Sequence, residues 1–140
     1  MLATANAAPQ RQQQIVPDAN ARSGAAVVQD YFEVHFIGEL EVGFQFPDVS
    51  SNEGLFVDYS VHAGEKWLAM SKPEGYVGQT QTAYADPEGA YVFNHPIDFH
   101  FATVSIAGWP RLHVQVGRLD EAGRADTVSY GSVPLPLVPG

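Results

Sequence analysis

Alternation of apolar and polar residues over positions 31–138 is the feature that most limits the fold of this chain. Apolar side chains recur at every second position in four runs, YFEVHFIGELEV (31–42), GLFVDYSVHAG (54–64), HPIDFHFATV (95–104) and RLHVQVG (111–117). This period places them on one face of a half-buried strand. Gly- and Pro-rich turns separate the runs, and no stretch of ten or more residues repeats apolar positions at helical spacing. The pattern predicts an all-β, antiparallel sandwich or barrel.

One further run, TVSYGSVPLPLV (127–138), predicts the last strand. Its prolines, Pro134 and Pro136, have no N–H to donate to a neighbouring strand. We therefore expect this strand at an edge of its sheet rather than in the centre.

Residues 1–30 have a different composition, rich in Ala, Gln, Asn and Pro and without an aromatic residue. Such a segment has too little apolar surface to offset the entropy lost on ordering, so we expect a disordered leader before a domain at 31–140. A transit peptide is the competing interpretation, because the segment holds two arginines. Asp18, Asp30 and the lack of an amphipathic repeat argue against it.

The charge of the chain is strongly acidic. Seven Lys and Arg face sixteen Asp and Glu, which gives a net charge of −9, and the charges of residues 1–30 cancel. Such a surface repels phosphates, so we expect no nucleic-acid partner and membrane association only through other proteins. Cysteine is absent, which excludes disulfides, thiolate metal sites and a cysteine nucleophile and fits a reducing compartment.

The five histidines are candidates for metal binding and for acid–base chemistry. Four of them fall on outward strand positions and one in a turn before a proline; they are His35, His62, His100, His113 and His95. None forms a His-x-His or His-x-x-x-His pair with a carboxylate partner, so we predict no metal site. Asp98 and His100 would meet Asp58 and His62 only if their strands were neighbours, and no Gly-x-Ser-x-Gly elbow is present. We predict no catalytic residue, no cofactor and no enzymatic activity.

Large aromatic residues allow a second kind of site. Trp67 and Trp109, with tyrosines nearby, could line a sugar-binding face if both indoles were exposed together. Trp67 lies in an apolar run, however, and Trp109 directly precedes Pro110. Packing in the core or at a corner is therefore the favoured interpretation.

The segment VGRLDEAGRADTVSYG (116–131) resembles a calcium loop of the calcium- and lipid-binding sandwiches known as C2 domains. Asp120 and Asp126 match aspartates of that loop, and Asp48 could match one in the other calcium loop. Arg118 stands in place of the first aspartate. Calcium requires six to eight oxygen ligands, so we expect a degenerate site without metal. A C2-type calcium- and lipid-binding module remains the alternative function.

A longer resemblance covers residues 31–140 and points to the B9-domain family of ciliary transition-zone proteins. VHFIGEL (34–40), LFVDYSVHAGEKWLAM (55–70) and EGYVGQTQT (74–82) match it in order. The residues that carry it further along the chain are His95, Pro96, Asp98, Gly108, Trp109, Pro110, Gly123, Arg124, Tyr130 and Gly131.

The resemblance implies a C2-like sandwich that acts as a structural subunit rather than an enzyme. It implies other B9-domain proteins and Meckel syndrome complex subunits as partners, at the basal body and transition zone of the cilium, in the cytoplasm and cytoskeleton. There the family contributes to cilium assembly and to a diffusion barrier. Because the family domain continues past a Pro-Gly like that at 139–140, we expect the sandwich to be incomplete at its C-terminal end.

Overall fold

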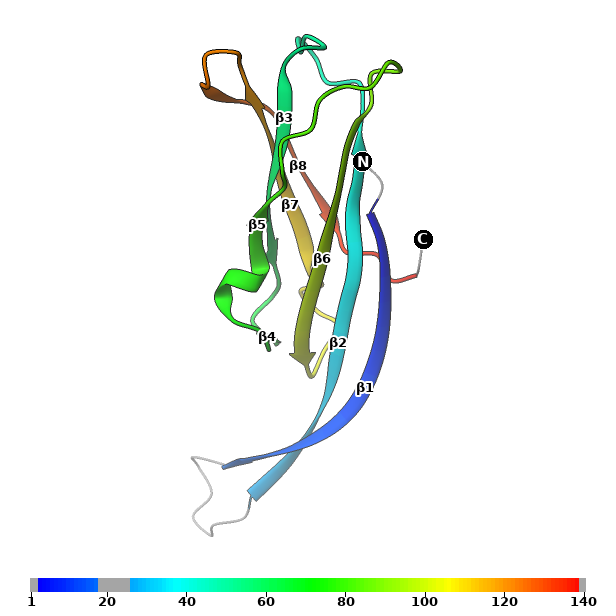
Figure 1. The fold of residues 1–140 in the computed structure, drawn as a ribbon. Helices are drawn as coiled ribbons and strands as arrows, with labels where there is room; N and C mark the ends of the chain where they lie inside the picture. Colours follow the sequence, from blue (N-terminus) through cyan, green and yellow to red (C-terminus); the bar gives the residue numbers. More distant parts are fainter. Residues whose placement is uncertain (1–2, 18–25, 139–140) are drawn as a thin grey trace.

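The computed structural model describes residues 3–17 and 26–138, which form eight strands and one short 3-10 helix (Figure 1). The strands are β1 (Ala3–Pro17), β2 (Ala26–Gly43), β3 (Gly54–His62), β4 (Trp67–Ala69), β5 (Val77–Gln79), β6 (Tyr91–Thr103), β7 (Arg111–Leu119) and β8 (Ala125–Pro134). The 3-10 helix η1 (Pro73–Tyr76) precedes β5. No helix of these residues has the length and apolar character needed to cross a membrane.

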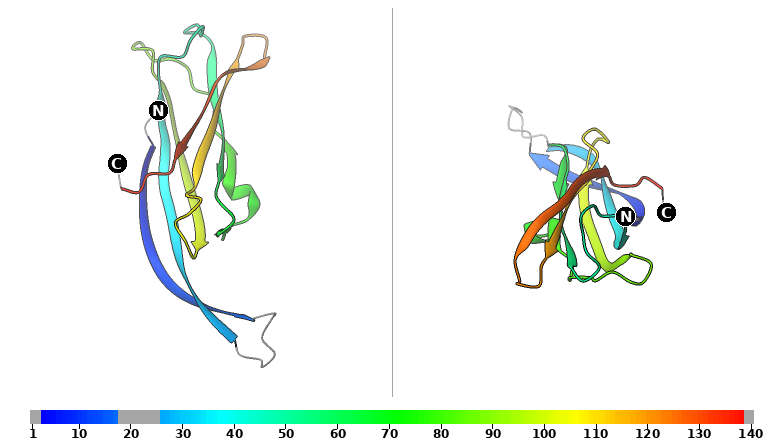
Figure 2. Two further views of the ribbon diagram at one scale, coloured as in Figure 1. Left: turned by 180° about the vertical axis from the view of Figure 1, so that it is seen from behind. Right: turned by 90° about the horizontal axis from the view of Figure 1, so that it is seen from above.

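The strands form two four-stranded antiparallel sheets, in the orders β1-β2-β6-β4 and β5-β3-β7-β8. The sheets face each other as two layers, which the view from above separates (Figure 2). The all-β sandwich that alternation predicts is confirmed.

The core lies between the sheets and is built from the apolar positions of the alternating strands. Phe36 of β2 and Phe99 of β6 are almost completely buried, as are Val57 of β3 and Leu112 of β7. The intervening residues of these strands are mostly exposed or half-buried. Burial of alternate side chains therefore fixes which face of each strand points inward.

The N-terminal segment differs from the prediction. A disordered leader was expected over residues 1–30, but Ala3–Pro17 forms β1, which pairs with β2 from Ala3↔Leu40 to Pro17↔Ala26. The hairpin extends past the ends of the other strands (Figure 1). Main-chain N–H and C=O groups make these pairings, and such groups are present whatever the side chains. Residues 1–2 and 18–25 of the expected leader lie outside the described residues.

Strand β8 lies at the edge of its sheet, beside β7. It ends at Pro134, so the edge position expected from Pro134 and Pro136 is confirmed. No residue of β8 is fully buried. The strand is therefore held mainly by its main-chain pairing with β7.

Candidate functional site

Two tryptophans build the corner between β6 and β7. Their rings meet edge to face at 5.2 Å, and Trp109 also packs edge to face on Phe36 at 5.6 Å. Trp67 Nε1 donates a hydrogen bond to the carbonyl oxygen of Ala107 at 2.9 Å. Each indole therefore combines ring packing with a polar partner, as buried tryptophans generally do.

This corner also fixes the chain after β8. Trp109 Nε1 donates to the carbonyl oxygen of Leu135 at 2.7 Å, and Leu135 N donates to the carbonyl oxygen of Pro110 at 2.9 Å. Leu135 is buried, whereas Leu137 and Val138 just beyond it are exposed. Trp67 is only 7% exposed, so the two indoles do not form the shared open surface that a sugar-binding face requires.

Arg118 stands at the centre of the loops that the C2 resemblance singles out. Its Nε and Nη2 donate to the two carboxylate oxygens of Asp126, at 3.1 and 2.6 Å. Its Nη1 donates to the carbonyl oxygen of Asp48 at 3.0 Å and lies 3.7 Å from Glu53 Oε1. The hydrogen bonds with Asp126 raise the pKa of Arg118. The positively charged guanidinium of Arg118 thus lies between the carboxylates of Asp126 and Glu53 and the carbonyl oxygen of Asp48.

Asp120 shapes the neighbouring turn. Its Oδ1 accepts hydrogen bonds from the main-chain N–H groups of Ala122 and Arg124, and its Oδ2 accepts one from Arg124 Nε. The N–H and guanidinium of Arg124 hold the pKa of Asp120 below its ordinary value. Gly123 in this turn has a φ of +78°, a conformation that favours glycine. Both carboxylate oxygens of Asp120 therefore accept hydrogen bonds within this turn.

We predict that this loop cluster binds calcium no more tightly than about 1 mM, because too few oxygens are free and Arg118 repels the ion. Titration calorimetry with calcium chloride tests this on the wild-type chain. Replacing the cation with a ligand, in Arg118→Asp, should tighten binding about tenfold because calcium affinity follows the charge of the ligands. A micromolar wild-type site that is lost in Asp120→Asn would contradict the prediction.

The remaining residues of the family motif lie along β6 and β8. His95 falls within β6 and not in the expected turn, because main-chain pairing with β2 begins before it. Its Nε2 lies 3.1 Å from the hydroxyl oxygen of Tyr59. Pro96 and Asp98 are exposed, and in β8 Tyr130 is exposed while Gly131 pairs with Val114.

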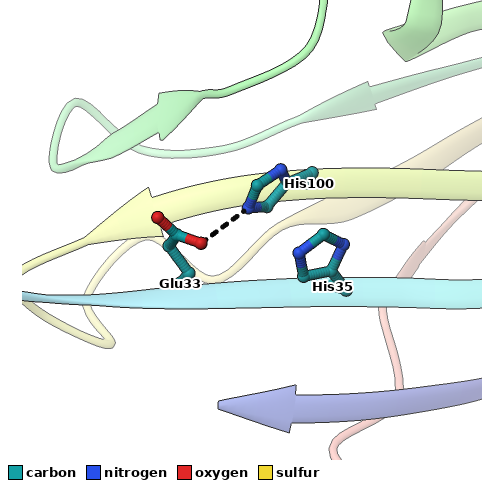
Figure 3. Close-up of side chains that lie close together, drawn as sticks. All are labelled: Glu33, His35 and His100. Carbon is teal, nitrogen blue, oxygen red and sulfur yellow. Dashed lines mark ion pairs between the residues drawn. The ribbon is translucent and has the colours of Figure 1, made fainter. Parts of the chain in front are cut away.

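The acid and histidine residues of β3 and β6 do not come together. Asp58 and His62 belong to one sheet, and Asp98 and His100 belong to the other. Sequence reasoning missed a different group, Glu33, His35 and His100 (Figure 3). The period of two does place Glu33 and His35 on one face of β2, but the cross-strand register that adds His100 has no local signal.

Strand β8 and the residues after it form an open edge of the β5-β3-β7-β8 sheet. Four large apolar side chains here are strongly exposed: Tyr130, Val133, Leu137 and Val138. We call residues 125–138 the β8 edge. Unpaired main-chain groups on an edge strand can accept a strand from another protein.

Comparison with known proteins adds to this geometry. Residues 34–140 match the family model for ciliary basal body-associated B9 proteins, B9-C2. The chain belongs to the B9 domain family. The resemblance seen in the sequence is thus confirmed, together with the C2-like sandwich.

Individual members of the B9 family are similar over most of this chain. B9 domain-containing protein 2 of Xenopus laevis is 38% identical over 109 residues, which are 77% of this chain and 58% of that protein. The Homo sapiens protein of the same name is 38% identical over 108 residues, with the same coverage. B9 domain-containing protein 1 of Mus musculus is 30% identical over 116 residues, 83% of this chain and 55% of that protein. The chain therefore spans little more than half the length of these relatives.

Proposed function

We propose that this chain is a non-enzymatic structural subunit of the ciliary transition-zone complex, needed for cilium assembly and for the diffusion barrier at the ciliary base. Its partners are other B9-domain proteins and Meckel syndrome complex subunits, and these bring it to membranes. Membership of the family of ciliary basal body-associated B9 proteins supports the cellular setting.

The β8 edge is the observation that supports binding as the activity. Tyr130 is 87% exposed and Leu137 is 71% exposed, so both apolar side chains are accessible to a partner. Both lie beside a long edge strand, so one partner segment could pair with the main chain and cover these side chains together. The other described edge of this sheet, β5, has only three residues.

The alternative of a C2-type calcium- and lipid-binding module has less support. Arg118 donates hydrogen bonds to Asp126 and to the carbonyl oxygen of Asp48, the aspartates that would belong to the two calcium loops. The net charge of −9 opposes binding to anionic lipid. We therefore place the activity of this chain in protein–protein contacts.

Co-purification tests the proposal. We predict that the 140-residue chain retains a B9 domain-containing protein 1 and that the double variant Tyr130→Lys/Val133→Lys retains at least tenfold less. Lysine on an edge strand opposes further strand pairing. The matched control is Leu68→Lys/Val77→Lys, which adds the same charge to exposed positions on the two three-residue strands.

Circular dichroism and light scattering establish that both variants stay folded. The control variant should retain as much partner as the wild type. Equal retention by the two double variants would reject the β8 edge as the binding surface, and a wild-type chain that captures no B9 protein would reject the proposed function.

A further inference from the structure

We propose that Glu33, His35 and His100 form a binding site for one zinc ion on the outer face of the β1-β2-β6-β4 sheet. Among the residues that the structure describes, these three form the group of His, Asp or Glu side chains whose donor atoms all lie within 4.8 Å of one another. Figure 3 shows the Glu33 carboxylate facing the His100 ring across the two strands, with the His35 ring beside them. Two imidazoles and one carboxylate are a donor set that zinc commonly takes.

The strand register brings the three side chains together. His35 and His100 are direct cross-strand partners in the β2–β6 pairing, and Glu33 precedes His35 by two positions on the same face of β2. Val34 and Phe36, which alternate with them, point into the core. The three candidate ligands therefore lie on the opposite face from the apolar core.

The distances suit a tetrahedral ion. Zinc lies about 2.0–2.2 Å from nitrogen and oxygen ligands, so two ligands of a tetrahedral site are about 3.3–3.5 Å apart. His100 Nε2 lies 3.3 Å from Glu33 Oε2. The imidazoles of His35 and His100 stack with centroids 3.6 Å apart, and the donor atoms of all three residues lie within 4.8 Å of one another. Because an imidazole nitrogen binds a metal in the plane of its ring, the His35 ring has to turn out of the stack to reach an ion held by Glu33 and His100.

A second observation concerns the ring nitrogen of His100. His100 Nε2 is buried and has no hydrogen-bond partner, because the contact with Glu33 lacks hydrogen-bond geometry in spite of its length. A buried polar atom without a partner is costly. A zinc ion held by this nitrogen and the carboxylate would satisfy both groups.

The strands around Glu33, His35 and His100 hold the backbone of the proposed site in place. β2 is paired on one side with β1 and on the other with β6, so the backbone that carries two of the ligands is fixed. The side chains of Glu33 and His100 are only 12% and 22% exposed. Three protein ligands leave a fourth position for water, and the ion would link β2 to β6.

Zinc titration of the full 140-residue chain, prepared without a histidine tag, tests the site. One equivalent of zinc should bind with a Kd in the micromolar range or below, and magnesium should not compete because it prefers all-oxygen sites. The variants His100→Gln, His35→Gln and Glu33→Gln should each weaken binding at least tenfold.

The control is a diagonal histidine pair, His62 and His113 of β3 and β7, whose rings lie 4.9 Å apart. In the strand register His62 lies opposite Arg111 and His113 lies opposite Ser60. No carboxylate joins this pair within the described part of the chain as a three-ligand group. The double variant His62→Gln/His113→Gln should bind zinc as the wild type does. Equal weakening by this control and by His100→Gln would overturn the proposal.

Nitrogen NMR of the imidazoles gives a readout that does not depend on the variants folding. Of the five histidines, two should change their ring nitrogen shifts on addition of one equivalent of zinc and three should not. The unfolding midpoint should rise with zinc concentration, because the ion binds the folded state. A wild-type chain with no response in the shifts, or with a Kd weaker than about 1 mM, would overturn the zinc site.

Discussion

Replacing Trp109 with alanine should lower the free energy of unfolding by about 3 kcal/mol, at the lower end of the usual range for a large buried aromatic. Trp109 is half-buried and contacts Phe36 and Trp67 edge to face. The substitution removes both ring contacts and leaves the carbonyl oxygen of Leu135 without its donor. For a domain of this size, the unfolding midpoint should fall by about 10 °C.

Thermal and urea unfolding followed by circular dichroism measure this loss. Trp109→Phe keeps an aromatic ring in the corner but removes the N–H donor and part of the ring volume, so it should cost about 1–2 kcal/mol, less than the alanine substitution. Tyr130→Ala serves as a control, because its ring is 87% exposed and its removal should change stability by no more than about 0.5 kcal/mol. Equal losses in Trp109→Ala and Tyr130→Ala would show that the corner does not stabilise the domain.

The same substitution should reduce partner binding through the β8 edge. Trp109 holds Leu135, which lies between the end of β8 and the exposed Leu137. Trp109→Ala removes the hydrogen bond that holds Leu135, so the C-terminal end of the β8 edge is no longer fixed. The sequence of the β8 edge itself is unchanged. Trp109→Ala should therefore lower both the free energy of unfolding and the amount of partner retained. Tyr130→Lys/Val133→Lys should lower only the amount of partner retained.

Local periodicity explains how much of the fold the sequence predicts. The runs at 54–64, 95–104 and 111–117 correspond to β3, β6 and β7, because alternation records which side chains face the core. β5 is too short for a pattern, and β1 carries no alternation. β1 is instead defined by its main-chain pairing with β2, which depends on the partner strand rather than on its own residues.

In the candidate sites, too, contacts between residues close in the sequence can be predicted, whereas contacts between distant segments cannot. Asp120, Arg124 and Gly123 lie close in the sequence, and the turn that they form follows from their residue types. The position of Asp48 beside Arg118 depends instead on how two distant loops meet. The group around His100 likewise depends on the register of β2 against β6, which becomes known only when the strands are paired.

Close backbone contact at the Trp109 corner leads to the second large effect, which concerns Gly108. Its φ is +75°, and a Cβ there would lie 2.6 Å from the Cα of Gly64. The two segments are also joined by a hydrogen bond from Gly64 N to the carbonyl oxygen of Gly108 at 2.8 Å. A side chain at position 108 therefore has to strain its own backbone and push the other segment away.

We predict that Gly108→Ala costs about 2–3 kcal/mol, from about 1–2 for the left-handed conformation and about 1 for the lost hydrogen bond. Gly123→Ala is the matched control, because Gly123 has nearly the same φ, +78°, and no atom within 4 Å of its Cβ position. Only the conformational cost should appear there. Urea unfolding of both variants separates the two contributions, and equal losses would mean that the approach of Gly64 to Gly108 adds nothing to the stability of the corner.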